Sequence, residues 1–340
     1  MARFIRVMLL TILFLTGVNP SMTYAKASAA TDLEQERFEL FQKFGQITGI
    51  PWYYLAAMNQ YEKNIAKFST KPGKKQKDAS TGRQLLSIDI PSELWGGMLN
   101  PDQNERNVNI IQFFDGLGRD GNGDHQADRH NDMDVLFSIA SYLGNYGYTE
   151  DDIRIGLWEY YHMDKAVDLI SEYAQIYQAF HTLKLSANVF PLPLHSDYSY
   201  RSTWGSARGY GGRRMHEGCD LFANYGTPVR SVCYGYIEVR GWNRFGGWRV
   251  GIRDLNNVYH YYAHLGGFNK KLKVGDIVKP GDVVGWVGSS GYGKPGTSGK
   301  FPPHLHYGMY KFNGKTEWAF DPFPHLNKWE REEARNKKKR

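Results

Sequence analysis

The sequence predicts a multidomain chain, with an N-terminal part built mostly of α-helices and a C-terminal part built of antiparallel β-strands. Residues 31–186 contain amphipathic stretches in which apolar side chains recur near the helical period of 3.6 residues. After residue 208 the pattern changes to short apolar runs punctuated by glycines, which is typical of an all-β domain. A chain of 340 residues is long enough for two domains, each with its own core.

Four stretches of the N-terminal part are expected to be helical: 31–48, 52–65, 132–146 and 150–183. Residues 187–207 are rich in proline and serine and have the composition of a linker. In the C-terminal domain, residues 208–326, strands are expected at 228–239, 248–253, 258–264, 282–287 and 304–312. Residues 327–340 are expected to form a charged tail, as a helix or a frayed end.

The first 27 residues have the pattern of a signal peptide. Arg3 and Arg6 precede an apolar run at 7–18, and residues 25–27 (Ala-Lys-Ala) fit a small-residue cleavage site. The apolar run is shorter than the roughly 18 residues expected of a spanning helix. We therefore expect a protein that is secreted or held in the cell wall, with a membrane-tethered, uncleaved form as the alternative.

The formal net charge of +7 favours an anionic partner. For an exported protein, anionic wall polymers fit that charge better than nucleic acid. The lysines concentrate at 71–77 and in the tail, however, and such like-charge runs are usually solvated segments, so a role in solubility is the other interpretation. The oligomeric state stays open.

Cys219 and Cys233 flank a predicted turn at 224–227. If the flanking runs form a hairpin, the two cysteines lie opposite each other and a disulfide is compatible with that separation. Two buried free thiols are the alternative.

Histidine and aspartate in the β domain form a candidate metal site. His216 and Asp220, with one of His304 and His306, give the two-histidine, one-carboxylate shell of a catalytic zinc. Such a zinc lowers the pKa of a bound water to about 7 and polarises a carbonyl, which is what amide hydrolysis needs.

Spacing constrains how these residues meet. On a regular strand His216 and Asp220 would lie about 13 Å apart, so the segment must bend, and Gly218 permits a bend. His304 and His306 share one face of a strand, so one can bind the metal while the other reaches the substrate. His264 ends a further strand and completes the set, whereas His260 and His325 are interpreted as structural.

Residues 208–325 resemble the lysostaphin/LytM-type zinc endopeptidases, which cut the peptides of bacterial peptidoglycan. The resemblance rests on "MHEGCDLFANYGTPVRSVCYGYI", "YYAHL", "VGDIVKPGDVVGWVGSSGY" and "PPHLHYGMY". It implies that His216, Asp220 and His306 are the zinc ligands and that His264 and His304 are the catalytic histidines. No ligand is missing, which favours an active enzyme. The bond cut stays open between a glycine bridge, the D-Ala cross-link and the L-Ala to D-Glu bond of the stem.

The helical part resembles, more weakly, the lysozyme-like lytic transglycosylases. The segment "GIPWYYLAAMNQYEKNI" places Glu62 where that family carries its general acid. Lys63 departs from the family pattern and a second carboxylate is not identified. A glutamate on an ordinary helix face is therefore the alternative to a glycan-cleaving acid.

A loop in the helical part has the spacing of a calcium site. Asp120, Asn122, Asp124 and Asp128 take positions 1, 3, 5 and 9 of an EF-hand-like loop. His125 replaces the glycine of position 6, and no glutamate stands at position 12. A polar turn is the alternative to bound calcium.

The sequence thus predicts an exported, zinc-dependent endopeptidase that hydrolyses peptide bonds of bacterial peptidoglycan. Two alternatives keep the wall as the target: a bifunctional hydrolase whose helical part also cleaves glycan, and a non-catalytic activator of other wall enzymes. A lipoyl- or biotinyl-carrier domain shares the "VGDIV" hairpin but has no use for the histidines.

Overall fold

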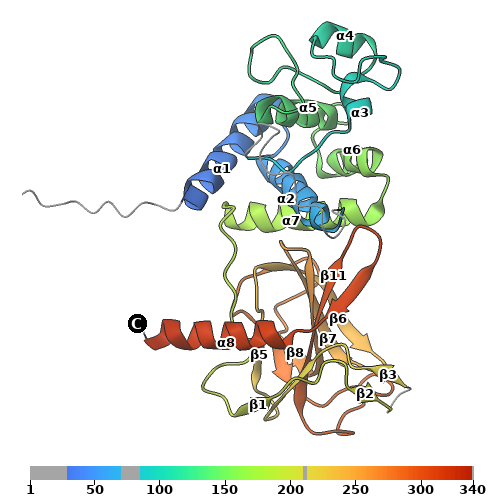
Figure 1. The fold of residues 1–340 in the computed structure, drawn as a ribbon. Helices are drawn as coiled ribbons and strands as arrows, with labels where there is room; N and C mark the ends of the chain where they lie inside the picture. Colours follow the sequence, from blue (N-terminus) through green and yellow to red (C-terminus); the bar gives the residue numbers. More distant parts are fainter. Residues whose placement is uncertain (1–28, 70–84, 210–212, 339–340) are drawn as a thin grey trace, which may run out of the picture.

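The computed structural model describes residues 29–69, 85–209 and 213–338 and has the predicted fold class (Figure 1). Helices make up the N-terminal half, and an antiparallel sheet makes up most of the C-terminal half. The predicted signal peptide, residues 1–27, lies outside the described residues. Within the described ranges, no helix has the length and apolar character needed to cross a membrane.

Seven helices form the described N-terminal half. They are α1 (Ala29–Thr48), α2 (Trp52–Ser69), α3 (Ser92–Gly96), α4 (Val108–Phe113), α5 (Asp132–Gly144), α6 (Glu150–Tyr161) and α7 (Asp164–Phe180). Asn107, Asn131 and Thr149 cap the starts of α4, α5 and α6 by accepting backbone N–H groups. The stretch expected as one helix at 150–183 is two, because His162 adopts a left-handed backbone (φ 48°) that ends α6.

The C-terminal half contains twelve strands and a last helix in the described residues. They are β1 (Tyr198–Tyr200), β2 (Ala207–Arg208), β3 (Arg214–Met215), β4 (Cys219–Ala223), β5 (Pro228–Arg230), β6 (Gly235–Asn243), β7 (Gly247–Asp254), β8 (Val258–Phe268), β9 (Ile277–Val278), β10 (Val283–Val287), β11 (His304–Phe312), β12 (Glu317–Phe320) and α8 (Phe323–Lys338). The main sheet has the order β1-β4-β11-β8-β7-β6-β9, and β2 pairs with β3 separately.

The segment expected as a linker, residues 187–207, is built into the β half. Phe190 and Leu192 are fully buried in the core of the β half. Residues Tyr198–Tyr200 form β1, which pairs with β4. Its proline and serine content predicted a free connection, but its apolar side chains are buried against the sheet, so the β half begins before residue 208.

The expected charged tail is a helix that packs on the β half. Trp329 of α8 is buried in the core of that half. Glu333 forms an ion pair with Arg230 at 2.9 Å, and Glu330 accepts hydrogen bonds from the hydroxyls of Tyr198 and Tyr200. The charged residues of α8 therefore attach it to the domain rather than leaving it as a frayed end.

Of the two alternatives for Cys219 and Cys233, the structure has the second: they are separate, buried thiols, and the possible disulfide is absent. The turn at 224–227 does not close a hairpin: β4 pairs with β1 and β11, whereas β5 pairs with β10. The Cys219 thiol donates to the carbonyl of Arg201 instead, at 3.3 Å.

The two halves share an interface in which α7 lies over the end of the sheet (Figure 1). Leu255 and Phe312 of the β half belong to the hydrophobic core of the helical half. Side-chain amides of Gln60 and Asn64 both donate to the carbonyl of Leu255 at 2.9 Å. These contacts hold the helical half against β11 and the turn after β7, by both apolar burial and hydrogen bonds.

Replacing Trp329 by alanine is expected to lower the free energy of unfolding by about 3 to 5 kcal/mol, because it leaves a cavity where α8 packs on the sheet. Trp286→Ala is the matched control, since Trp286 is 36% exposed, and it should cost about 1 kcal/mol or less. Urea unfolding measures both. Equal losses would show that α8 is not part of the domain.

Candidate metal centre and active site

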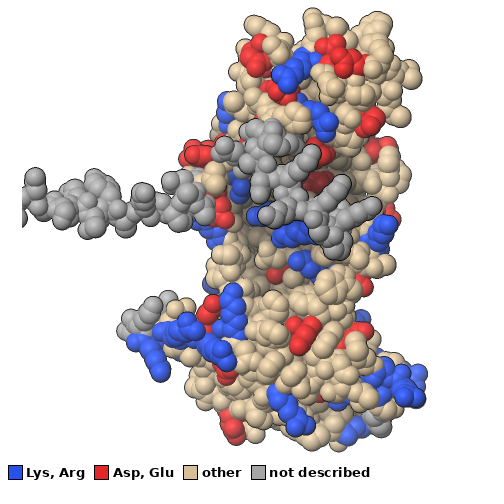
Figure 2. All heavy atoms as spheres, in the orientation of Figure 1, with Lys and Arg blue, Asp and Glu red and all other residues tan. Residues whose placement is uncertain are grey.

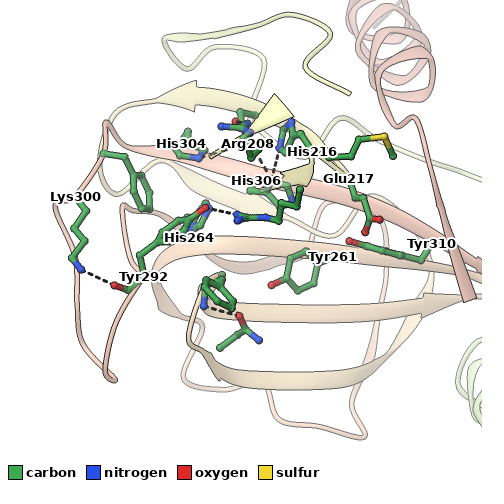
Figure 3. A pocket seen from close by; sticks show the side chains of 17 residues that line it. Arg208, His216, Glu217, Tyr261, His264, Tyr292, Lys300, His304, His306 and Tyr310 are labelled. Atoms are coloured by element: carbon green, nitrogen blue, oxygen red, sulfur yellow. Dashed lines mark hydrogen bonds and ion pairs between the residues drawn. The ribbon is translucent and has the colours of Figure 1, made fainter. Parts of the chain in front are cut away.

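A groove of about 470 Å³ opens on one face of the sheet, and the predicted site residues line it (Figure 3). His216 and Asp220 come from the entry into β4 and from β4 itself. His264 lies on β8, and His304 and His306 lie on β11. Residues separated by as many as 90 positions in the chain therefore meet in one site.

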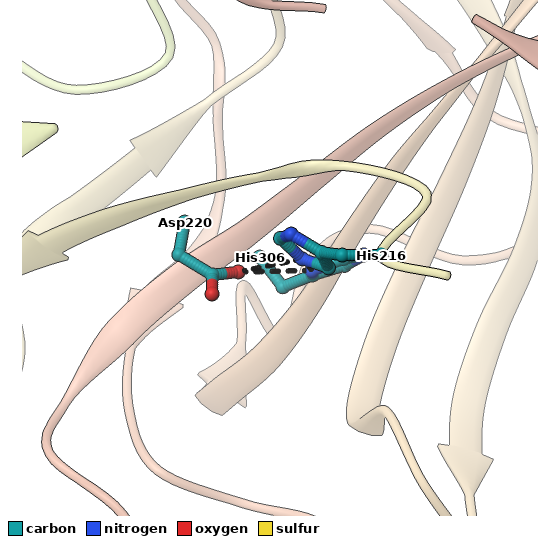
Figure 4. A group of neighbouring side chains, drawn as sticks. All are labelled: His216, Asp220 and His306. Atoms are coloured by element: carbon teal, nitrogen blue, oxygen red, sulfur yellow. Dashed lines mark hydrogen bonds and ion pairs between the residues drawn. The ribbon is translucent and has the colours of Figure 1, made fainter. Parts of the chain in front are cut away.

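Three side chains in this groove converge on a single point (Figure 4). His216 Nε2 lies 2.9 Å from His306 Nδ1 and 3.1 Å from Asp220 Oδ1, and the third distance, His306 Nδ1 to Asp220 Oδ1, is 3.0 Å. All three residues are buried or nearly so. Tetrahedral zinc with nitrogen and oxygen ligands separates its ligand atoms by roughly 3.3 Å, so the set fits zinc closely.

The hydrogen bonds around His216 explain why this point needs a cation. His216 Nδ1 lies 2.8 Å from the carbonyl oxygen of Thr203. A carbonyl only accepts, so Nδ1 carries the proton and Nε2 of the neutral ring presents a lone pair. That lone pair faces a carboxylate oxygen of Asp220, another acceptor. Two acceptors 3.1 Å apart repel each other unless a positive charge lies between them.

Asp220 is held in its ionised form. Burial alone would raise its pKa, but the neighbouring imidazole rings of His216 and His306 outweigh burial and hold the pKa of Asp220 well below its usual range. Arg208 adds an ion pair to the other carboxylate oxygen, Oδ2. The carboxylate is therefore ready to bind a metal at neutral pH with one oxygen, while the other is oriented by a guanidinium.

Strand register brings the ligands together. In the ladder between β11 and β4, His306 stands opposite Asp220, and in the ladder between β11 and β8 it stands opposite Ala263. Since β11 lies between these two strands, His306 is placed beside the carboxylate on one side and next to His264 on the other.

Gly218 bends the chain before β4, as the spacing of the ligands required, and it is also a contact point for the metal site. A Cβ atom at this position would lie 2.5 Å from Cε1 of His306 and 2.8 Å from the carbonyl oxygen of Tyr307. Only glycine lets the His306 ring lie against the backbone here. The sequence predicted the bend but not this close approach.

His264 and His304 lie beside the ligands and are both neutral. Burial lowers the pKa of His264 to about 3, and His306 and His304 nearby lower it further. Burial also lowers the pKa of His304. Their Nδ1 atoms face carbonyl oxygens of Ser290 and Pro302, each at 2.8 Å. In both rings Nε2 is therefore the atom available to a substrate.

The backbone of His264 is strained. Its φ is 62°, in the left-handed region that non-glycine residues rarely occupy. The β7–β8 ladder is irregular at this point, between Trp248 and Val250. The bulge turns the His264 ring toward His304, with the ring centroids 4.9 Å apart.

No pattern in the sequence identifies several of the residues that line the groove. Arg208, Arg214 and Lys300 place positive charge around the groove, and Tyr261 and Tyr292 form part of its wall. Arg214 donates to the hydroxyl of Tyr292 at 2.6 Å. They come from β2, β3, β8 and the loop 288–303, and only the folded sheet brings them together.

Glu62 lies on α2, on the other half of the molecule from the metal site. The hydroxyl of Tyr161 donates to it at 2.7 Å. Burial raises the pKa of Glu62 to about 7, and the charge of Asp89 raises it as well, although the Tyr161 hydrogen bond opposes this. A glutamate with that pKa can hold a proton near neutral pH, so a role as an acid stays a prediction.

The loop that had calcium-site spacing uses its carboxylates in other contacts. Asp120 accepts the backbone N–H groups of Gly123 and His125, and Asp128 pairs with Arg106 at 3.3 Å. Within the described ranges the converging metal-ligand sets lie elsewhere, at His216–Asp220–His306 and at Cys233–Asp254–His260. The structure favours the polar turn, and bound calcium is not supported by Asp120, Asn122, Asp124 and Asp128.

Replacing Gly218 by alanine is expected to weaken zinc binding by about 10- to 100-fold, because the new methyl group displaces the His306 ring. Competition with a chromogenic chelator measures this without reference to activity. Gly241→Ala is the matched control, since a Cβ there meets no atom within 4 Å. Unchanged zinc affinity in Gly218→Ala would contradict the role given to this contact.

Comparison with known proteins agrees with this site. The model of peptidase family M23 matches residues 214–322. The chain is 53% identical over 327 residues to the L-Ala–D-Glu endopeptidase of Bacillus subtilis (strain 168), covering 96% of this chain and 98% of that protein. It is 39% identical over 114 residues to lysostaphin of Staphylococcus simulans, covering 33% of this chain and 21% of that protein.

A solved structure also aligns with part of the chain. The catalytic domain of lysostaphin from Staphylococcus simulans aligns at 34% identity and a TM-score of 0.32, covering 39% of this chain and 92% of that chain. Identity over nearly the whole length of a known peptidase, together with the family match across the metal ligands, shows that this chain belongs to peptidase family M23 and is a zinc-dependent endopeptidase.

Proposed function

We propose that this enzyme hydrolyses the L-Ala–D-Glu bond in the stem peptide of bacterial peptidoglycan. One observation carries the choice of bond: the chain is 53% identical to an L-Ala–D-Glu endopeptidase across 98% of that protein, helical half included. The shorter matches to lysostaphin cover only the peptidase domain. Likeness in both halves favours the same substrate, because the helical half is part of what is shared.

His216, Asp220 and His306 are the residues that would hold the zinc ion. When bound, zinc supplies a water of lowered pKa and a Lewis acid for the scissile carbonyl. His216 is oriented by Thr203, and Asp220 by Arg208, so the ligands are fixed before the ion binds.

His264 and His304 are suited to move protons. Each is neutral and has Nε2 free, so either ring can take a proton from the attacking water. The imidazolium that results can donate that proton to the leaving amine nitrogen. While it is charged it also stabilises the negative oxygen of the tetrahedral intermediate. Two histidines on neighbouring strands allow one to act as base while the other holds the oxyanion.

Charge around the groove is compatible with an acidic stem peptide. Arg214 and Lys300 line it, and Glu217 is its one acidic side chain besides Asp220 among the lining residues that the structure describes. D-Glu carries a free carboxylate next to the bond that is cut. Complementary charge favours such a substrate over a neutral one.

The proposed substrate lies outside the cytoplasmic membrane, so the enzyme is proposed to act as an exported protein in the cell wall. The basic and apolar pattern of residues 1–27 supports export. The formal charge of +7 supports a further attraction to anionic wall polymers.

His306→Ala is expected to abolish both zinc binding and the release of peptides from purified peptidoglycan, since it removes one of three ligands. Mass spectrometry of the products from the wild-type enzyme should show new D-Glu amino termini and L-Ala carboxyl termini. His195→Ala, an exposed histidine outside the groove, is the control and should behave as wild type. New termini at glycine or D-Ala would overturn the choice of bond, and peptide release by His306→Ala would overturn the mechanism.

A second candidate activity is cleavage of glycan by the helical half. The observation that favours it is Glu62, a buried carboxyl whose pKa is raised to about 7, so that it can hold its proton near neutral pH. A purely non-catalytic activator is not favoured, because the three proposed metal ligands converge and the two proposed catalytic histidines line the same groove.

Glu62→Gln should abolish any release of glycan fragments but leave peptide release intact. Because the pKa of Glu62 is raised from 4.5 to about 7 in the folded protein, the folded state binds the extra proton between these values, and stability falls as pH rises through them. In the Glu62→Gln variant, the decrease in the free energy of unfolding over this pH range should be smaller by roughly 2 kcal/mol. Urea unfolding at about pH 5 and about pH 8 tests the buried carboxyl. Glycan release that survives in the variant would exclude Glu62 as the acid.

A further inference from the structure

A second groove, of about 480 Å³, lies at the seam where α2, α8 and the sheet meet, and the peptidase reaction does not use it. Its wall comes from β8, β11, β12 and α8, and its rim includes Lys67 and Phe68 near the end of α2. On the face shown in Figure 2, lysine and arginine side chains lie at the waist between the two halves.

The pleat of β11 places this groove on the opposite face of the sheet from the active site. His304, His306 and Tyr310 point into the metal-site groove, whereas Met309 and Lys311 line the second groove. Successive side chains of a strand point to opposite faces, so the odd and even positions of β11 serve different grooves. The second groove is therefore a separate site and not an extension of the first.

Aromatic rings form a continuous wall in the second groove. Trp318 and Phe320 have ring centroids 5.6 Å apart, Phe320 and His325 are 5.7 Å apart, and His325 and Trp329 are 5.8 Å apart. Trp318 is 44% exposed. Exposed aromatic faces beside a cavity offer flat apolar surfaces against which the C–H faces of a sugar ring can pack.

Three lysines give the groove a positive rim. Lys67, Lys311 and Lys328 all line it. Within the described ranges neither Lys67 nor Lys311 lies in an ion pair, and the charge of Lys67 lowers the pKa of half-buried Lys311, after the larger effect of burial. The one carboxylate in the lining, Asp254, is already engaged by His260 and by the backbone N–H of Val258. Lys67 and Lys311 thus face the cavity without a neutralising partner among the described residues, whereas Lys328 lies 4.0 Å from Glu332 on α8. An anion in the groove would relieve the repulsion between Lys67 and Lys311.

We propose that this groove binds an anionic saccharide, whose sugar rings pack on the wall of Trp318 and Phe320 and whose negative groups meet Lys67, Lys311 and Lys328. That the saccharide belongs to the bacterial wall rests on the proposed function. That it is an anionic saccharide rests on the groove alone. Peptide-free glycan of alternating N-acetylglucosamine and N-acetylmuramic acid is the matching ligand, because each lactyl group then carries a free carboxylate.

Binding is to be measured by calorimetry on the full chain carrying His306→Ala, so that no peptide is cut during the titration. The probes are the peptide-free glycan, a chitooligosaccharide of equal length as its neutral counterpart, and polyglycerol phosphate as an anion without sugar rings. The glycan should bind about ten times more tightly than either of the others, and raising the salt from about 50 to about 500 mM should weaken it.

Trp318→Ala should weaken glycan binding by about ten-fold or more, and so should the double variant Lys67→Glu/Lys328→Glu. The matched controls are Trp286→Ala and Lys270→Glu/Lys271→Glu, which change exposed residues outside the groove and should leave affinity within about two-fold. Circular dichroism of each variant checks that it folds.

Three outcomes would overturn the proposal: equal affinity in the groove variants and their controls, equal binding of the neutral oligosaccharide, or equal binding of polyglycerol phosphate that Trp318→Ala does not change. The result is separate from the peptidase assignment. Failure of the wild-type enzyme to cut stem peptide would leave glycan binding unaffected, and loss of glycan binding would leave the metal site as it is.

Discussion

The pairing of β11 between β4 and β8 is the constraint on which the active site depends. It places His306 opposite Asp220 on one neighbour and opposite Ala263 on the other. A slip of one residue would turn His304 and His306 to the core face and bring Leu305 and Tyr307, both fully buried, into the groove. The apolar side chains at odd positions thus fix the register that the histidines need. Burial of the core and assembly of the metal site are the same structural event.

Hydrogen bonds to backbone carbonyls set the chemistry of the histidines. Thr203, Ser290 and Pro302 each fix the proton of one ring on Nδ1 and leave Nε2 to the metal or the substrate. The carbonyl of Pro302 is available because the chain enters β11 directly after it. The strained backbone of His264 also positions a histidine, because the bulge in β8 turns the His264 ring toward His304. Strand ends and a bulge, rather than strand centres, therefore supply the proposed catalytic groups.

The sequence was sufficient to select His216, Asp220 and His306 as a candidate metal set, which the fold brings together, because their spacing and residue types are typical of a zinc site. It was also sufficient for the two-part fold, since helical and strand periods occupy different halves of the chain. It failed at Cys219 and Cys233, where a local turn signal suggested a hairpin and the strands instead pair with β11 and β10, far away in the chain. It also did not predict that residues 187–207 and α8 pack on the β half. Their few apolar residues are buried only because the folded sheet presents a face to them. Arg208, Arg214 and Lys300 could not be predicted for the same reason: no local pattern encodes a meeting across strands.

The arrangement of two grooves on opposite faces of one sheet restricts how a wall polymer can be bound. A stem peptide in the metal site and a saccharide in the second groove cannot be neighbouring units of one short fragment, because the sheet separates them. The second groove must bind a distant part of the same strand or another strand. Its rim includes Lys67 of the helical half, and that half is held to the turn after β7 by hydrogen bonds from Gln60 and Asn64 to Leu255. The interface between the halves therefore contributes to the second groove, and this gives a physical reason why a peptidase domain that carries its own candidate metal site packs against a helical domain.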